Sequence, residues 1–115
     1  METTIINTAF HEVCQKAKAK ADELRQAKTN KELFEVLTPI LDNSDFEVKT
    51  ERSMEFNNPN MTVGVTIAYK KDPAMFIRSE VSTPINSRSA KSMARAEDRA
   101  TKTAMFVCLG IPLAD

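Results

Sequence analysis

The sequence predicts an α+β domain: an antiparallel three-stranded sheet in a β-β-β-α core, packed by a long C-terminal helix and preceded by N-terminal helices. Three observations predict it. Apolar residues recur at steps of three and four near both ends of the chain, as on one face of a helix. Residues 61–70 alternate strictly between an apolar and a small or polar face, as in a half-buried strand. Residues 70–73, Lys-Lys-Asp-Pro, have the composition of a turn into a further antiparallel strand.

The N-terminal third predicts two helices. The first covers residues 4–27 and carries a narrow, alanine-rich apolar stripe. The second begins near Asn30, where Thr29 and Glu32 have the spacing of a capping box. Pro39 lacks a backbone donor and is expected to kink or end this helix near Thr38. The first helix forms an N-terminal arm over residues 1–28, which packs either on its own domain or on a neighbouring subunit, and residues 29–115 form the core domain.

Three strands and a last helix follow. The strands are predicted over residues 46–52, 61–70 and 74–82, with residues 57–60 linking the first two. Ser87 is the expected N-cap of the last helix. Gly110 is expected to end that helix, because glycine adopts the left-handed conformation of a C-terminal cap, and Pro112 blocks continuation.

Composition bounds the functional classes. Sixteen basic residues balance sixteen acidic ones, so any contact with nucleic acid must be local. Cys14 and Cys108 have no paired spacing and are expected as free thiols in a reducing cytosol. No segment approaches the roughly 18 apolar residues that span a bilayer, and the N-terminus lacks a secretion signal. We therefore expect a cytoplasmic protein without a membrane partner.

No catalytic constellation is visible. His11 is the one histidine, and with Cys14 it supplies too few ligands for zinc. Gly64 and Gly110 are the two glycines, which excludes a glycine-rich phosphate loop. The sequence therefore predicts no enzyme, no cofactor, no metal and no small-molecule substrate.

The best functional candidate is a cationic ridge on the last helix. Its five basic residues are spaced 3, 4, 4 and 3 and span an arc of roughly 80° opposite the packing face. Acidic residues are nearly absent from it. The ridge is either a solvated helix face or a surface for a polyanion such as DNA. Its members are Arg88, Lys91, Arg95, Arg99 and Lys102.

Other residues extend this candidate surface. Phe106 lies on the cationic side, where it either packs in the core, meets another subunit or stacks on a base. Lys70 and Lys71 at the hairpin turn, with Arg78 on the third strand, are expected to form one groove wall with the ridge.

The two acidic residues inside this helix are also informative. Asp98 is expected to pair locally with Arg95 or Lys102. Glu97 projects toward the apolar face and either emerges at the edge of the sheet or pairs with a buried partner.

From Lys31 onward the sequence resembles the Erf-type phage single-strand annealing proteins and their eukaryotic ring-forming recombination-mediator relatives. Residues 33–41 are similar to the opening helix of that family, and residues 63–69 and 75–81 to its central hairpin. The last helix matches best, through Lys102 with its flanking small residues and through the Leu-Gly-Ile ending at 109–111. The Tyr-Ala-Arg-Arg-Tyr string that Erf proteins carry in this helix is absent.

The resemblance implies a bacteriophage DNA-recombination protein, acting in the cytoplasm of a bacterial host. Such a protein anneals complementary single-stranded DNA without ATP or a metal and assembles as a homo-oligomeric ring or filament. Single-stranded DNA would lie in a basic groove between the hairpin and the last helix, with Lys102 contacting a phosphate.

Two other classes stay open. A double-stranded RNA binding module also runs α-β-β-β-α and uses a lysine cluster at the start of its last helix. A small partner-binding or inhibitory protein without nucleic-acid contact suits the zero net charge. Salt dependence of oligonucleotide binding separates these classes from the annealing protein.

Overall fold

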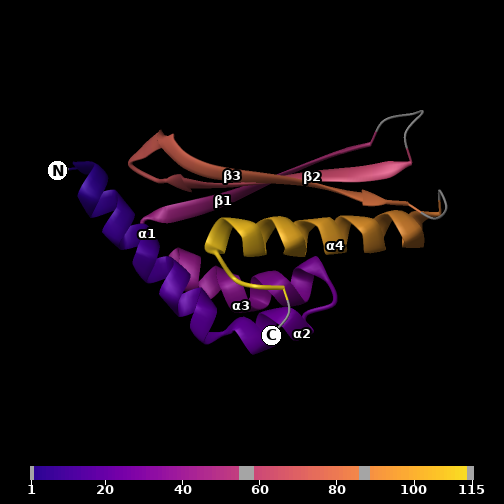
Figure 1. Ribbon diagram of the computed structural model, residues 1–115, viewed down its shortest axis with the longest axis horizontal. Helices are drawn as coiled ribbons and strands as arrows, with labels where there is room; N and C mark the ends of the chain where they lie inside the picture. The colour runs from indigo at the N-terminus through magenta and orange to yellow at the C-terminus, as the bar shows by residue number, and fades with distance from the viewer. Residues whose placement is uncertain (1, 55–58, 86–88, 114–115) are drawn as a thin grey trace.

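One antiparallel sheet with helices on a single face forms the molecule, as Figure 1 shows. The computed structural model describes residues 2–54, 59–85 and 89–113. The predicted α+β class is confirmed. The elements follow the order α1 (Glu2–Ala19), α2 (Ala21–Gln26), α3 (Asn30–Asp42), β1 (Phe46–Met54), β2 (Asn60–Tyr69), β3 (Asp72–Pro84) and α4 (Ala90–Leu109).

The sheet has the order β1-β2-β3, so β2 is central and the other two strands are edges. Val63 of β2 lies opposite Arg52 on β1 and Val81 on β3, and both pairings are antiparallel. The alternation of β2 turns Met61, Val63, Val65 and Ile67 toward the helices and buries them. Thr62 and Thr66 lie on the opposite face, which carries no helix in the described chain (Figure 1).

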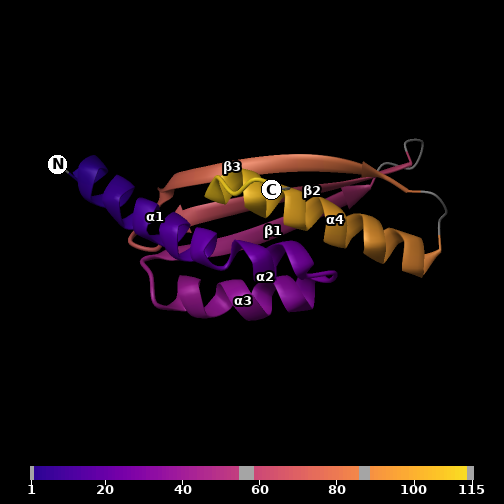
Figure 2. The ribbon, with the colours of Figure 1, turned by 60° about the horizontal axis from the view of Figure 1, so that its bottom comes forward.

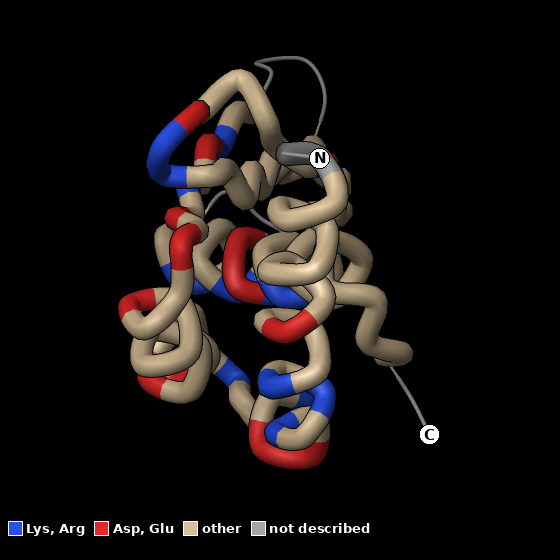
Figure 3. Tube along the Cα trace, turned by 90° about the vertical axis from the view of Figure 1, so that its left-hand side faces the viewer, with Lys and Arg blue, Asp and Glu red and all other residues tan. Residues whose placement is uncertain are grey.

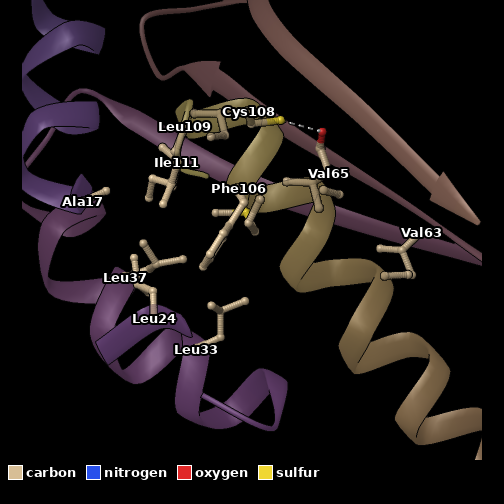
Figure 4. Close-up of a cluster of buried hydrophobic side chains, with 14 of the residues drawn as sticks. Ala17, Leu24, Leu33, Leu37, Val63, Val65, Phe106, Cys108, Leu109 and Ile111 are labelled. Atoms are coloured by element: carbon tan, nitrogen blue, oxygen red, sulfur yellow. Dashed lines mark hydrogen bonds between the residues drawn. The ribbon is translucent and has the colours of Figure 1, made fainter. Parts of the chain in front are cut away.

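The core lies between the sheet and the helices. Helix α4 packs on β2 and β3, and α3 packs on β1. Figure 4 shows Phe106 of α4 pointing toward Leu24 of α2 and toward Leu33 and Leu37 of α3. Ala17 of α1 is buried in the same cluster, so the predicted arm over residues 1–28 contributes directly to this core.

Local signals placed most helix ends correctly. The Thr29 side chain accepts a hydrogen bond from the Glu32 N–H at 3.2 Å, which confirms the N-terminal cap of α3. Gly110 caps α4 with a φ of 69°, a left-handed conformation that favours glycine. Ser87 lies outside the described residues, and Ser89 is the N-cap of α4.

One helix prediction is wrong, and of the two predicted effects of Pro39, the end of the helix near Thr38 does not occur. The predicted helix over residues 4–27 is interrupted at Lys20, whose φ of −105° and ψ of 16° separate α1 from α2. At this break the chain bends, and α2 continues below α4 (Figures 1 and 2). Helix α3 continues through Pro39 to Asp42. Pro39 is exposed, so water can hydrate the carbonyl that its missing N–H leaves unpaired.

Among the described helices, none combines the length and apolarity needed to cross a bilayer.

Candidate nucleic-acid interface

Helix α4 has an uncovered half and a covered half. Its first three turns extend beyond α2 and α3, as Figures 1 and 2 both show. Ala96 is the one fully buried residue in these turns among those described. From Ala100 onward the helix is buried on several sides, because the sheet covers one side and the N-terminal helices cover another. Residues that share one side of α4 in the sequence therefore meet different surroundings.

The uncovered half carries the part of the predicted ridge that is free. Lys91, Arg95 and Arg99 are all exposed. Their side chains make no hydrogen bond or ion pair within residues 2–54, 59–85 and 89–113. Arg88 lies outside the described residues. We call Lys91, Arg95 and Arg99 the α4 cationic row, since they occupy successive turns about 6 Å apart.

Lys102 is not part of an exposed ridge, contrary to the sequence prediction. Its ammonium donates to the carbonyl oxygen of Ala27 at 3.0 Å and to that of Arg25. It thereby caps the C-terminal end of α2, where carbonyls lack intrahelical partners. Burial lowers the pKa of Lys102. The charge predicted to meet a phosphate instead ties α4 to α2.

Phe106 lies in the core and is not part of the cationic surface. The side chain is 1% exposed and packs among the leucines of α2 and α3 (Figure 4). The Lys102 ammonium lies 5.9 Å from the centre of its ring. Of the alternatives for Phe106, packing in the core is the one the structure shows, and its ring is not accessible to a base.

Both acidic residues of α4 are held away from the cationic row. Glu97 accepts a hydrogen bond from Arg52 of β1 at 2.8 Å, so it emerges at the edge of the sheet. Asp98 accepts from the backbone N–H of Asn30 at 3.1 Å, instead of pairing with Arg95 or Lys102 as predicted. These partners lie on β1 and at the start of α3. The charge of the row is therefore not neutralised by the acids of its own helix.

A small cleft lies beside the row. It has a volume of about 90 Å³ and is lined by Pro84 of β3 and by Ser92, Arg95, Ala96 and Arg99 of α4. The lining includes two arginines, residues whose guanidinium groups bind oxyanions such as phosphate well. The helical periodicity of the cations did not reveal Ser92 or Pro84. Their contribution depends on how the end of β3 meets α4, which no local pattern encodes.

The hairpin lysines lie at the other end of the sheet. Strand β3 is 13 residues long, or roughly 40 Å, and separates the 70–71 turn from the cleft beside Pro84. The Lys70 ammonium donates to the Ser44 carbonyl at 2.9 Å, whereas Lys71 is exposed. Figure 3 shows basic positions interspersed with acidic ones at this end of the molecule. The turn does not form one groove wall with α4.

Arg78 lies on the helix-free face of the sheet, opposite to α4. Its guanidinium donates to Thr66 Oγ1 and to Glu80 Oε2, each at 3.1 Å. The same group covers Gly64, whose missing side chain leaves space for it. The structure therefore brings together the α4 cationic row, and it places Arg78 and the hairpin lysines elsewhere.

The described residues contain no group of three or more His, Cys, Asp or Glu side chains placed to hold a metal ion. Comparisons with protein-family models, curated proteins and solved structures find no match to this chain.

Proposed function

We propose that this protein binds single-stranded DNA along the uncovered half of α4. The observation that carries the proposal is the α4 cationic row: three cations on successive turns, with no partner in the described part of the chain and with both acids of the helix bound elsewhere. An isolated surface cation normally has little consequence. Three in line, beside a cleft of phosphate size, form an extended site for a polyanion.

The start of α4 supports a role in anion binding. Its first turn contains no acidic residue and carries Lys91. A cation near a helix N-terminus is unfavourable by a few tenths of a kcal/mol, because the helix dipole is positive there. A bound phosphate reverses this effect, since it neutralises the cation and meets the favourable end of the dipole. Positive charge at this end therefore favours the binding of an anion, whereas it slightly destabilises the helix without a ligand.

The choice of single-stranded DNA, and of strand annealing in recombination as the outcome, rests on the resemblance to the Erf-type proteins. The row is short and local, which agrees with a neutral chain that contacts nucleic acid at one surface. Annealing would proceed without ATP, on a homo-oligomer whose copies each hold part of a strand. Lys102, Phe106, Arg78 and Lys70 have no place in this proposed contact, because their side chains are engaged within the fold.

Equilibrium binding to a labelled single-stranded oligonucleotide at several salt concentrations tests the proposal. With about three phosphate contacts per chain, log affinity should fall against log salt with a slope near −2, at about −0.7 per contact. The paired substitution Arg95→Ala with Arg99→Ala should make this slope shallower, between about −1 and zero. Lys71→Ala is the matched control, since Lys71 is an exposed cation far from the row.

The alternatives give different results. No binding at low salt would overturn any nucleic-acid function and favour the protein-partner class. Preference for duplex RNA over single-stranded DNA would favour the double-stranded RNA binding class. If the Arg95/Arg99 variant binds as the unmodified protein does, the site lies elsewhere. Annealing is measured separately, as the rate at which two complementary oligonucleotides pair with and without the protein.

A further inference from the structure

The outer edge of the sheet, formed by β3, exposes several large apolar side chains, and another lies nearby on α4. Phe76 and Ile77 of β3 are 59% and 40% exposed, and Val107 of α4 is 61% exposed. A groove of about 290 Å³ opens at the start of this strand, lined among others by Ile6, Phe10 and Ile77. Isolated exposed apolar residues are ordinary, but Phe76 and Ile77, which point to opposite faces of the sheet, both border the unpaired edge of β3.

The two edges of the sheet differ in their protection. Sheet edges are usually shielded from pairing by charges along the strand. The β1 edge has this protection, because Glu47, Lys49, Glu51 and Arg52 follow one another closely. Strand β3 has no charge between Asp72 and Arg78, and no other strand of the described chain pairs with its outer side. Charge therefore protects the first half of β3 less than it protects β1, although Pro73 removes one backbone donor from that stretch.

Strand β3 is complementary to itself in one register. In an antiparallel pairing centred on Ser79, residue 78 of each copy lies opposite residue 80 of the other. Arg78 then faces Glu80 of the second copy, and this occurs twice on the helix-free face. On the helix-covered face, Ile77 lies opposite Val81 of the second copy, which buries apolar surface on both sides. Both charge pairs and both apolar pairs arise from one two-fold axis.

The same two-fold axis also explains the exposure of Val107 in the single chain. Cys108 donates to the Val65 carbonyl at 3.7 Å, and Val65 lies opposite Ser79 in the sheet (Figure 4). This part of α4 therefore lies beneath the Val65–Ser79 pair, next to the proposed two-fold axis at Ser79. Val107 follows Ala96 by three turns on nearly the same side of α4, the side that meets the end of β3. Val107 therefore points toward the β3 edge.

Helix spacing is compatible with this arrangement. Helix α4 packs under both β2 and β3. Strands lie about 4.8 Å apart, so pairing two β3 edges puts the two copies of α4 about 10 Å apart. Packed helices are separated by about 8–10 Å, so Val107 would meet Val107 of the second copy.

We propose that a second copy of this chain docks on the β3 edge about this two-fold axis, giving a six-stranded sheet with Arg78–Glu80 pairs between copies. This inference does not depend on the proposed nucleic-acid function. The exposed Phe76, Ile77 and Val107 side chains all lie at or next to the interface.

Charge reversal gives a direct test, with mass in solution measured by light scattering. The unmodified protein should have twice the mass of one chain. Arg78→Glu alone, or Glu80→Arg alone, sets like charges opposite each other twice and should give monomers. Mixing these two variants should restore dimers of one chain of each kind, and the double reversal should dimerise by itself. Glu51→Arg, on the same face but at the other edge, is the matched control and should stay dimeric.

Each result bears on the proposal. Circular dichroism checks that each single variant folds, because Arg78 also donates hydrogen bonds to Thr66 and Glu80 within its own chain. Val107→Asp, which leaves strand charges unchanged, should also dissociate the dimer. A monomeric unmodified protein would overturn the proposal. So would a dimer or larger ring that survives both single reversals, or a mixture of the two that stays monomeric.

Discussion

Removing the Lys102 ammonium should destabilise the fold and leave nucleic-acid binding by the folded protein unchanged. The substitution Lys102→Met keeps most of the apolar stem and removes the donor. The lost interactions are two hydrogen bonds, to the carbonyls of Arg25 and Ala27 at the end of α2. Both carbonyls would then depend on water at a half-buried position.

The magnitude follows from these two bonds. A hydrogen bond contributes about 1 kcal/mol net, so the variant should lose about 2 kcal/mol in free energy of unfolding. Lys102→Ala also removes methylene groups packed near Phe106 and should lose about 3 kcal/mol. For a chain of this length, the loss of 2 kcal/mol lowers the melting temperature by about 8 °C.

Urea unfolding followed by circular dichroism measures the loss as a lower midpoint at an unchanged slope. Lys91→Met is the matched control, because Lys91 is the same residue type, exposed on the same helix. Its unfolding should match that of the unmodified protein, while its affinity for single-stranded DNA falls. The reasoning is refuted if Lys102→Met unfolds like the unmodified protein and loses affinity for DNA.

Three further predictions concern buried groups. Phe106→Ala should lower the free energy of unfolding by about 3–5 kcal/mol in urea, because the ring is 1% exposed; a stable variant with weakened DNA binding would contradict this. Asp98→Ala removes the acceptor for the first N–H of α3 and should cost about 1 kcal/mol in the same measurement, with Asp98→Asn recovering part of it. Burial raises the pKa of Cys14 and Cys108 above 9.0, the ordinary thiol value. The unfolded chain therefore loses these protons first, and stability should fall as pH rises through 9.0. Urea titrations between about pH 8 and pH 10 should show a smaller fall for the protein with both cysteines changed to alanine.

Features encoded by neighbouring residues were predictable from the sequence. The alternation of β2, the hairpin turn, the Thr29 cap and the Gly110 cap each depend on a few adjacent residues, and each is present. The sequence could not decide whether Pro39 ends its helix, because the cost of an interior proline depends on whether water reaches the freed carbonyl.

The candidate site was predictable only in part. Periodicity places Lys102 and Phe106 on the same side of α4 as Arg95 and Arg99. It does not contain the information that α2 and α3 cover the last turns of the helix and leave the first turns bare. That boundary depends on contacts between residues about 70 positions apart, such as Asp98 with Asn30.

The division of α4 into a bare half and a packed half separates two kinds of sequence constraint along one helix. From Ala100 onward, side-chain volume is fixed by neighbours on several sides, and a substitution there changes folding. Before that point, Lys91, Arg95 and Arg99 touch little besides solvent, so their charge and length can vary with small effects on the folded state. Substitutions in the first turns can therefore change the charge of that surface while the remainder of the helix stays fixed.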